Sequence, residues 1–466
     1  MAAVFDYFEG ESRYPELDAA GAVSRLAEAI RCRTVNRGDG DYGEFERLQA
    51  LMRAFYPAVM AAGSFELIGH SVLITIPGTN PALRPSLYMA HQDVVPVVRG
   101  TEDNWTHGAF SGDIAEDSVW GRGTLDIKQM LFGILEAAEA LLKSGARFQR
   151  TAYLAFGEDE ETLNLGALGI AEALRARGVR LEYVLDEGGG LIEDGAVFGA
   201  PGVPVTLIDL MEKGYADLEL SAESIGGHSS RPWGGSSLEH IARAVTAITD
   251  RPFPPRCPEP LLQSFAALAP FVQVEPLRTL ARDVKTNAEA IAAWCLTQPE
   301  LFSLVTTTVA PTMIEGGSAA CNVLPQNMRA VINFRLNQGE SAESLLSHCR
   351  EAISAADPES PVRLRFLQAN DPSGIARTDG VGYAVLKTAL GEFYPRVMAV
   401  PSLTAGATDA HQYERICDTC LRCSPFMVEK ELARSGVHGT DEHIPVRSYL
   451  QGIRVLMRIM ELGNIR

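Results

Sequence analysis

The chain lacks three features that would each point to a particular class of protein: a long hydrophobic run, an excess of basic residues and a dense set of cysteines. A helix that spans a bilayer needs about 20 consecutive apolar residues, and no run in the sequence approaches that length. With 41 Lys and Arg against 59 Asp and Glu, the formal net charge is −18. Because a negative field repels nucleic acids and anionic lipid surfaces, we predict no nucleic-acid partner and no membrane partner.

Cysteine usage and the first residues indicate a reducing compartment. Eight cysteines spread over 466 residues are too sparse for a disulfide framework. The segment from Met1 to Glu9 contains acidic residues and no basic stretch, so we predict no secretory signal. Together these features predict reduced cysteines and a cytoplasmic location.

The residues that are present are typical of a globular protein, with 46% hydrophobic and 21% charged residues. A chain of this length exceeds one ordinary core and predicts two domains. The apolar spacing predicts helices at 21–32, 44–60, 127–143 and 165–176, and short apolar runs predict strands at 87–90, 151–156 and 181–185. Strands that alternate with helices in this way predict an α/β fold with a mixed, mostly parallel sheet sandwiched by helices.

From about Glu212 the pattern changes. Residues 215–220, 328–336 and 362–367 alternate between apolar and polar positions, as half-exposed antiparallel strands do. Helical patterns at 238–249, in an insert that runs to about 295 and at 341–356 lie between them, and the first pattern resumes at 379. We therefore predict a first domain made of residues 1–211 and 373–466, with an α+β domain inserted at 212–372.

Polar residues gather where the predicted strands end. His91 and Asp93 follow the first strand, four consecutive acids (Glu158 to Glu161) follow the second, and Asp186 follows the third. Residues two apart on an extended backbone point the same way, so Asp93 can orient the imidazole of His91. In open α/β sheets, ligands bind at this edge.

These side chains form a mixed nitrogen and oxygen set: His91, Asp126, Glu160 or Glu161, Asp186 and a histidine of the tail. Such a set suits zinc, cobalt or manganese. The number of carboxylates suits a two-metal hydrolytic site, in which one carboxylate bridges the ions. Simpler interpretations stay open at this point, because Asp126 also fits a helix cap and the four acids also fit a solvated turn.

The sequence resembles a family of zinc metallopeptidases that includes aminoacylase, glutamate carboxypeptidase, succinyl-diaminopimelate desuccinylase and carboxypeptidase S. The resemblance covers nearly the whole chain and is nearest to the carboxypeptidase S branch. Five motifs occur in the family's order: HQDVVPV from residue 91, GRGTLDIK from 121, GEDEET from 157, LDEGG from 185 and HGTDE from 438. The resemblance implies a zinc-peptidase-like catalytic domain, with the inserted domain acting as a lid or dimerisation domain.

The resemblance also implies a role for each motif residue. His91 and Asp186 would bind one zinc ion, Glu161 and His438 would bind the second, and Asp126 would bridge the two ions. Asp93 would orient His91. Glu160 would be the general base that takes a proton from a metal-bound water and passes it to the leaving nitrogen.

Three further residues would bind the substrate. His228 matches a lid histidine that in several relatives reaches the active site across a dimer interface, which would make this chain a homodimer through the inserted domain. Asn322 matches a substrate-binding asparagine. Relatives often have an arginine for the substrate carboxylate where this chain has His411, so recognition of that carboxylate would depend on Arg335, Arg422 or His411 itself.

Two other motifs have less specific interpretations. Cys417, Cys420 and Cys423 have the spacing of a zinc or iron–sulfur site, but no fourth thiolate is adjacent, and we interpret them as buried, reduced cysteines. The triple glycine at 188–190 lacks the spacing of a nucleotide-binding loop, and no helix clearly follows it.

These observations predict an amide hydrolase with two zinc ions, for which cobalt or manganese can substitute. Its substrate would be a small N-acyl-amino acid or a short, dipeptide-like molecule, bound in a cleft between the catalytic domain and the lid. One alternative is a deacylase or deamidase of an N-substituted compound that has no free α-carboxylate. Another is a metal-dependent binding protein without catalysis, although a complete ligand set beside Glu160 argues against it.

Overall fold

The computed structural model describes residues 4–232 and 234–465. The chain divides into two compact units by its internal contacts. The first unit comprises Met1–Met211, Gly374–Ser402 and Thr408–Arg466, and the second comprises Glu212–Ser373 and Leu403–Ala407. The second unit is therefore almost entirely one insertion into the first.

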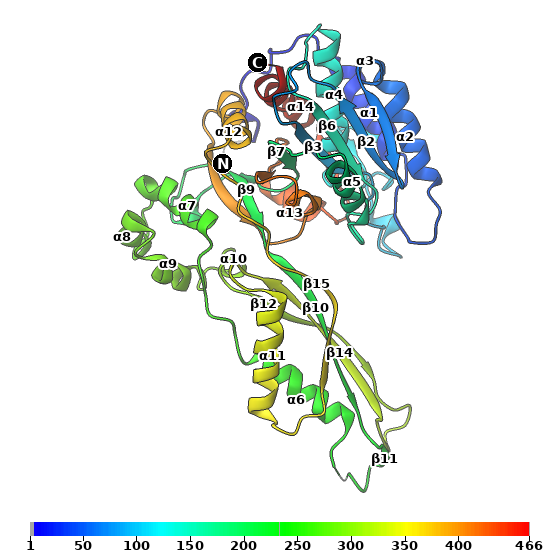
Figure 1. Cartoon of the computed structure of the whole chain (residues 1–466), viewed down its shortest axis with the longest axis vertical. Helices are drawn as coiled ribbons and strands as arrows, with labels where there is room; N and C mark the ends of the chain where they lie inside the picture. The colour runs from blue at the N-terminus through cyan, green and yellow to red at the C-terminus, as the bar shows by residue number, and fades with distance from the viewer. Residues whose placement is uncertain (1–3, 233, 466) are drawn as a thin grey trace. The chain divides into compact units, whose positions relative to one another are not determined.

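The first unit contains a nine-stranded mixed sheet in the order β1-β2-β6-β3-β7-β17-β9-β16, with β8 paired to β9 (Figure 1). Its centre is parallel, because β3 pairs in parallel with β6 and β7, and β17 pairs in parallel with β7. The pairs β1–β2, β2–β6 and β17–β9 are antiparallel. The predicted α/β class is confirmed.

The strands of this sheet are β1 (Ser64–Ile68), β2 (Ser71–Ile76), β3 (Ser86–His91), β6 (Ala152–Gly157), β7 (Tyr183–Asp186), β8 (Gly190–Ile192), β9 (Val205–Glu212), β16 (Met398–Thr404) and β17 (Cys420–Arg422). The helices of the first unit are α1 (Ala19–Ile30), α2 (Gly43–Phe55), α3 (Pro57–Ala62), α4 (Lys128–Lys143), α5 (Leu165–Ala176), α12 (Val381–Phe393), α13 (Lys430–Gly436) and α14 (Val446–Met460). A small separate sheet joins β4 (Asp113–Ala115), β5 (Ser118–Trp120) and β18 (His443–Pro445).

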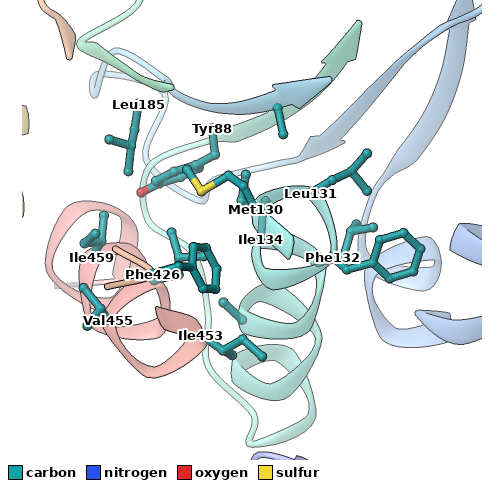
Figure 2. Close-up of a cluster of buried hydrophobic side chains, with 14 of the residues drawn as sticks. Tyr88, Met130, Leu131, Phe132, Ile134, Leu185, Phe426, Ile453, Val455 and Ile459 are labelled. Carbon is teal, nitrogen blue, oxygen red and sulfur yellow. The ribbon is translucent and has the colours of Figure 1, made fainter. Parts of the chain in front are cut away.

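Strand β3 shows how the sheet is covered on both faces. All six of its residues are buried, as expected for a parallel strand in the middle of a sheet. Tyr88 and Ala90 belong to the core beneath α1, α4, α12 and α14, whereas Leu87 and Met89 belong to the core beneath α5. Figure 2 shows the first of these cores, where side chains of α4 and α14 meet those of the sheet.

The second unit is a four-stranded antiparallel sheet in the order β12-β14-β10-β15, with α6 and α11 packed on one face. Alternate residues of β10, from Ala216 to Ala222, point into the core beneath these helices. The elements are β10 (Gly214–Glu223), β11 (Gly227–His228), β12 (Thr308–Gly316), β13 (Val323–Leu324), β14 (Asn327–Leu336), β15 (Arg363–Asn370), α6 (Ser237–Thr249), α7 (Glu259–Leu268), α8 (Leu277–Leu280), α9 (Ala288–Cys295), α10 (Phe302–Val305) and α11 (Ala342–Ala356). In the part of the chain that the structure describes, no helix has the length and apolar character to cross a membrane.

Candidate metal centre

The predicted ligands meet at one edge of the parallel strands. His91 and Asp186 are the last residues of β3 and β7, and β6 pairs with β3 so that Gly157 lies opposite His91. Glu161 follows β6 by four residues. His438 lies two residues beyond α13. The carboxyl ends of neighbouring parallel strands therefore bring together residues far apart in the sequence.

Asp126 lies between the two histidines. Its Oδ1 is 3.2 Å from Nε2 of His91, and its Oδ2 is 2.9 Å from Nε2 of His438. The same Nε2 of His438 is 3.1 Å from Oε1 of Glu161. One carboxylate that presents an oxygen to each of two histidines is the arrangement that a bridging ligand requires.

Asp93 contacts both His91 and the turn that carries Glu160 and Glu161. Its Oδ1 is 3.3 Å from Nδ1 of His91, which leaves Nε2 of that ring facing Asp126. The two oxygens of Asp93 also accept hydrogen bonds from the backbone N–H groups of Glu160 and Glu161, at 3.2 and 3.1 Å. Asp93 is completely buried, so one carboxylate fixes a candidate ligand and the turn that carries two others.

At the end of β7, Glu187 lies nearer to His91 than the predicted ligand Asp186 does. Asp186 is not part of any potential metal-binding group among the described residues, and its two oxygens accept backbone N–H groups of Glu187 and Ala410, both at 2.8 Å. Glu187 instead places Oε1 3.5 Å from Nε2 of His91 and forms a group with His91 and Asp126. By distance, Glu187 is therefore a further candidate ligand that the sequence did not single out, and the role of Asp186 stays a prediction.

The strand pattern explains this difference. On β7, Val184 belongs to the core beneath α5, and Leu185 belongs to the opposite core. Asp186 continues this alternation towards the α5 side, where Ala410 lies in the turn η6 (Asp409–Tyr413). Glu187 comes after the strand has ended. The sequence shows two consecutive acids, Asp186 and Glu187. It does not show which of the two faces the site.

Burial and mutual repulsion set the charges of the carboxylates. Burial, together with the nearby charge of Asp126, raises the pKa of Glu187 to about 7. Burial also raises the pKa of Glu160 well above its usual range. Burial would lower the pKa of His91, but its hydrogen bonds to Asp126, Asp93 and Glu187 raise it well above the usual value. The hydrogen bonds to Asp126 and Glu161 raise the pKa of His438 to about 10.

The residues present fit a pair of metal ions. Three groups of potential ligands have donor atoms within 4.8 Å of one another: His91, Asp126 and Glu187; His91, Glu160 and Glu161; and Asp126, Glu161 and His438. Imidazole and carboxylate donors suit zinc, cobalt and manganese. The raised pKa values of the carboxyl groups reflect an acidic cluster that cations would relieve.

A buried ion pair joins the segments that carry Asp126 and His438. Glu442 accepts hydrogen bonds from the backbone N–H groups of Gly123, Leu125 and Asp126, at 2.7 to 3.2 Å. Its other oxygen is 2.6 Å from Nη1 of Arg122, and Nη2 of that arginine donates to the carbonyl of Gly439, next to His438. We call Arg122 and Glu442 the clamp.

The predicted substrate-binding residues lie in different units. Within the second unit, β11 and β13 pair so that His228 lies opposite Val323, and the N–H of Ser229 donates to the carbonyl of Asn322 at 2.9 Å. His228 and Asn322 are thus neighbours, and both are exposed. His411 lies in η6 of the first unit, with Nδ1 3.8 Å from Oε2 of Glu414. Their roles stay predictions.

The two arginines considered as carboxylate partners have other contacts. Arg422 is fully buried and donates to Oγ1 of Thr408 and to the carbonyl of Cys420. The guanidinium of Arg335 lies over the ring of Tyr215 in the second unit. Burial makes Arg422 part of the interior of the first unit.

The three clustered cysteines are buried and form no disulfide. Cys417 and Cys420 belong to the core beneath α5, whereas Cys423 belongs to the core on the other face of the sheet. The three thiols therefore pack into two separate cores.

The sequence is similar to that of known peptidases and amide hydrolases. The family model described as "Peptidase family M20/M25/M40" matches residues 87–462. A "Probable carboxypeptidase S-like 2" of Dictyostelium discoideum is 31% identical over 442 residues, which cover 92% of this chain and 82% of the relative. An "N-fatty-acyl-amino acid synthase/hydrolase PM20D1.1" of Danio rerio is 29% identical over 100% of this chain and 89% of the relative.

The fold is also that of solved structures. The M20 family metallo-carboxypeptidase Sso-CP2 from Sulfolobus solfataricus superimposes with a TM-score of 0.69 at 18% identity, covering 95% of this chain and 99% of that one. Human carnosine dipeptidase 1 gives a TM-score of 0.64 at 15% identity over 97% of this chain and 98% of that one. At these identities the similarity establishes the fold.

Proposed function

The chain belongs to the M20/M25/M40 peptidase family of metallohydrolases, and from this membership we propose that it hydrolyses an amide bond with the help of two bound metal ions. We propose that these ions are zinc. The observation that carries the proposal is Asp126, whose two oxygens face His91 and His438. We assign His91 and Glu187 to one ion and Glu161 and His438 to the other, with Asp126 shared. Bound there, the ions would supply the Lewis acidity that polarises a carbonyl and acidifies water.

Glu160 is the general base of the proposed reaction. It lies beside Glu161 and within the ligand group of His91, and burial gives it a pKa above that of a solvent-exposed carboxyl. A stronger base accepts the proton of the attacking water more readily, and the resulting acid then protonates the leaving nitrogen. Asp93 takes no part in proton transfer and instead holds the backbone of Glu160 in place.

The test is Glu160→Gln, which keeps the size of the side chain and removes its basicity. We expect kcat to fall by about 100- to 10,000-fold while the metal content, measured by elemental analysis, stays at the wild-type value. Glu172→Gln is the matched control, because Glu172 lies on α5 and pairs with Arg175 at the surface. Full activity in Glu160→Gln would remove Glu160 from the mechanism.

The proposed substrates are N-acyl-amino acids or dipeptide-like molecules. The similarity to a carboxypeptidase S-like protein and to an N-fatty-acyl-amino acid synthase/hydrolase supports this class. A hydrolysis screen with added zinc, cobalt or manganese tests it. The same substrates with the α-carboxylate converted to an amide test carboxylate recognition, and equal rates for acid and amide would exclude it.

A further inference from the structure

A cavity of about 270 Å³ adjoins the candidate metal centre within the first unit. Glu187 is part of the cavity wall. Its Oε1 is also 3.5 Å from Nε2 of His91, so the cavity lies next to the candidate metal ligands. Gly188, Gly189 and Gly190 continue the same wall. This is the triple glycine that follows β7.

The glycines leave this space free. A Cβ placed on Gly190 would meet no atom within 4 Å, whereas one on Gly189 would strike the carbonyl oxygen of Leu207 at 2.2 Å. Both residues have positive φ, at 130° and 64°, which side chains rarely adopt. The glycines therefore form a wall without side chains beside the metal ligands.

Apart from Gln129 and Ser424, apolar side chains form the rest of the cavity. They come from the segment before and into α4, from β8 and β9, and from the segment that leads into α13: Ile127, Met130, Ile192, Leu207, Phe426 and Val428. Glu187 is the single charged residue among the described residues that line it. A substrate carboxylate would be repelled there, so the cavity suits the uncharged end of the substrate.

Phe426 makes the inner wall rigid. Its ring packs directly against two glycines, Gly133 of α4 and Gly452 of α14. A Cβ on either glycine would come within 2.6 or 2.1 Å of the ring, so only glycine leaves room for it. The ring also stacks on Tyr449, with centroids 6.0 Å apart. Figure 2 shows Phe426 between these two helices. Phe426 is therefore a firmly packed part of the cavity wall.

Resting on the proposed function, we infer that this cavity holds the acyl chain of an N-acyl-amino acid and limits its length. A methylene group takes up about as much room as a water molecule, whose share of volume is about 30 Å³. The cavity then accommodates about nine chain carbons, which is a medium-length acyl group. The amino acid, with its carboxylate, lies outside it.

The test uses the full-length, metal-loaded protein and a series of N-acyl-glycines from acetyl to hexadecanoyl. Glycine has no side chain, so only the acyl chain can fill the cavity. Each methylene that leaves water is expected to raise kcat/KM about fourfold, until the chain reaches about nine carbons, and longer chains bring no further gain.

Two substitutions shift this limit in opposite directions. Ala433→Leu adds three carbons at the wall formed by α13 and is expected to shorten the optimal chain by about three carbons. Phe426→Leu removes three carbons from the inner wall and is expected to lengthen it by a similar amount. Ala384→Leu is the matched control, because Ala384 is exposed on α12, and its profile should follow that of the wild type.

The outcomes separate the inference from the proposed function. If neither the N-acyl-glycines nor the other N-acyl-amino acids and dipeptides of the hydrolysis screen are cleaved, the proposed function fails. If other amides are cleaved and no N-acyl-glycine is, the function stands and the inference is overturned. If acyl-glycines are cleaved at rates that do not depend on chain length, the function stands and the inference is overturned. The inference is also overturned if the two substitutions change the preference for the amino-acid side chain in N-acetyl-amino acids instead of the acyl-chain optimum.

Discussion

At the scale of single residues, Glu442 has an effect beyond its own position. It accepts hydrogen bonds from three backbone N–H groups before α4 and, through Arg122, is joined to the chain next to His438. Glu442 and Arg122 are almost completely buried, so their opposite charges are paired away from water. The clamp thus sets the separation between the segments that carry Asp126 and His438.

We predict that Glu442→Gln lowers the affinity for metal by about 10- to 100-fold. The amide keeps the volume of the side chain but cannot accept from every donor of the clamp, and it leaves Arg122 buried without a countercharge. Competition against a chromophoric chelator measures the affinity. Glu431→Gln is the control, because Glu431 pairs with Arg434 on the exposed side of α13. An unchanged affinity in Glu442→Gln would show that the clamp has no influence on the metal ligands.

The residue scale also shows where sequence reasoning stops. The positions of His91, Asp126, Glu161 and His438 followed from ordered motifs, and the structure brings these four side chains together. The choice between Asp186 and Glu187 depends on the residue at which β7 ends. A local sequence pattern does not define the end of a strand to one residue. The clamp depends on a contact between positions 320 residues apart, which no local spacing reveals.

At the scale of secondary structure, Lys213 joins the start of β10 to the helical insert. Its Nζ donates to the carbonyls of Ser303 and Thr306 at 2.6 and 2.8 Å, at the end of α10. Burial, together with the charge of Arg335, lowers the pKa of Lys213 to about 7. The unfolded chain therefore binds more protons than the folded one between about pH 7 and 10.4.

We predict that this lysine makes the second unit more stable as the pH rises. Below pH 7 both states are protonated and folding bears the full cost of the buried charge. Above it, the free energy of unfolding rises by up to about 1.4 kcal/mol per pH unit. Urea unfolding of wild type and Lys213→Met across this range measures the difference, with the exposed Lys285→Met as control. A pH dependence that Lys213→Met leaves intact would contradict the prediction.

Most helices and strands could be predicted from the spacing of apolar residues, because the same residues form the buried face of each element. The helix predicted at 165–176 is α5, with the same bounds. The helix predicted at 44–60 is instead divided into α2 and α3. Pro57 begins the second, since proline has no N–H to continue the first and disfavours a helical residue before it. Periodicity could not predict that the ring of Phe426 packs between Gly133 and Gly452. This contact forms only because helices from distant parts of the chain lie together in the fold.

At the scale of the whole molecule, the metal centre sets how stability depends on pH. Without metal, the folded chain holds carboxyl groups with raised pKa values, Glu187 at about 7 and Glu160 well above its usual value. It also holds His438, whose pKa is raised to about 10. Each group binds its proton more tightly in the folded state than in the unfolded one, so its contribution is lost as the pH rises through the folded pKa.

We therefore predict that, without metal, the contribution of the metal centre to stability falls as the pH rises from about 4.3 towards 10, and that zinc removes most of this dependence. Bound cations replace the protons and stabilise the folded state, by about 2.7 kcal/mol when free zinc is 100 times its Kd. Thermal unfolding with a chelator and with excess zinc, compared at several pH values, measures the effect. Parallel pH profiles in the two conditions would contradict it.

The last prediction concerns the division into two units. The second unit has its own core, formed by residues between Ala216 and Ala369. Its ends are adjacent, because the N–H of Ser373 donates to the carbonyl of Glu212 at 3.2 Å and the N–H of Glu212 donates to Oγ of Ser373 at 2.8 Å. A chain segment with a separate core and adjacent ends has what independent folding requires.

We accordingly expect residues 212–373, expressed alone, to fold with the secondary structure seen here and to unfold cooperatively in urea, as followed by circular dichroism. A fragment of the same length shifted to residues 222–383 is the control. It loses nearly all of β10, which pairs with both β14 and β15 at the centre of the sheet, so its remaining strands cannot close the core. Because β14 and β15 both pair with β10, a cooperative transition in both fragments would show that the boundary at 212 has no structural meaning.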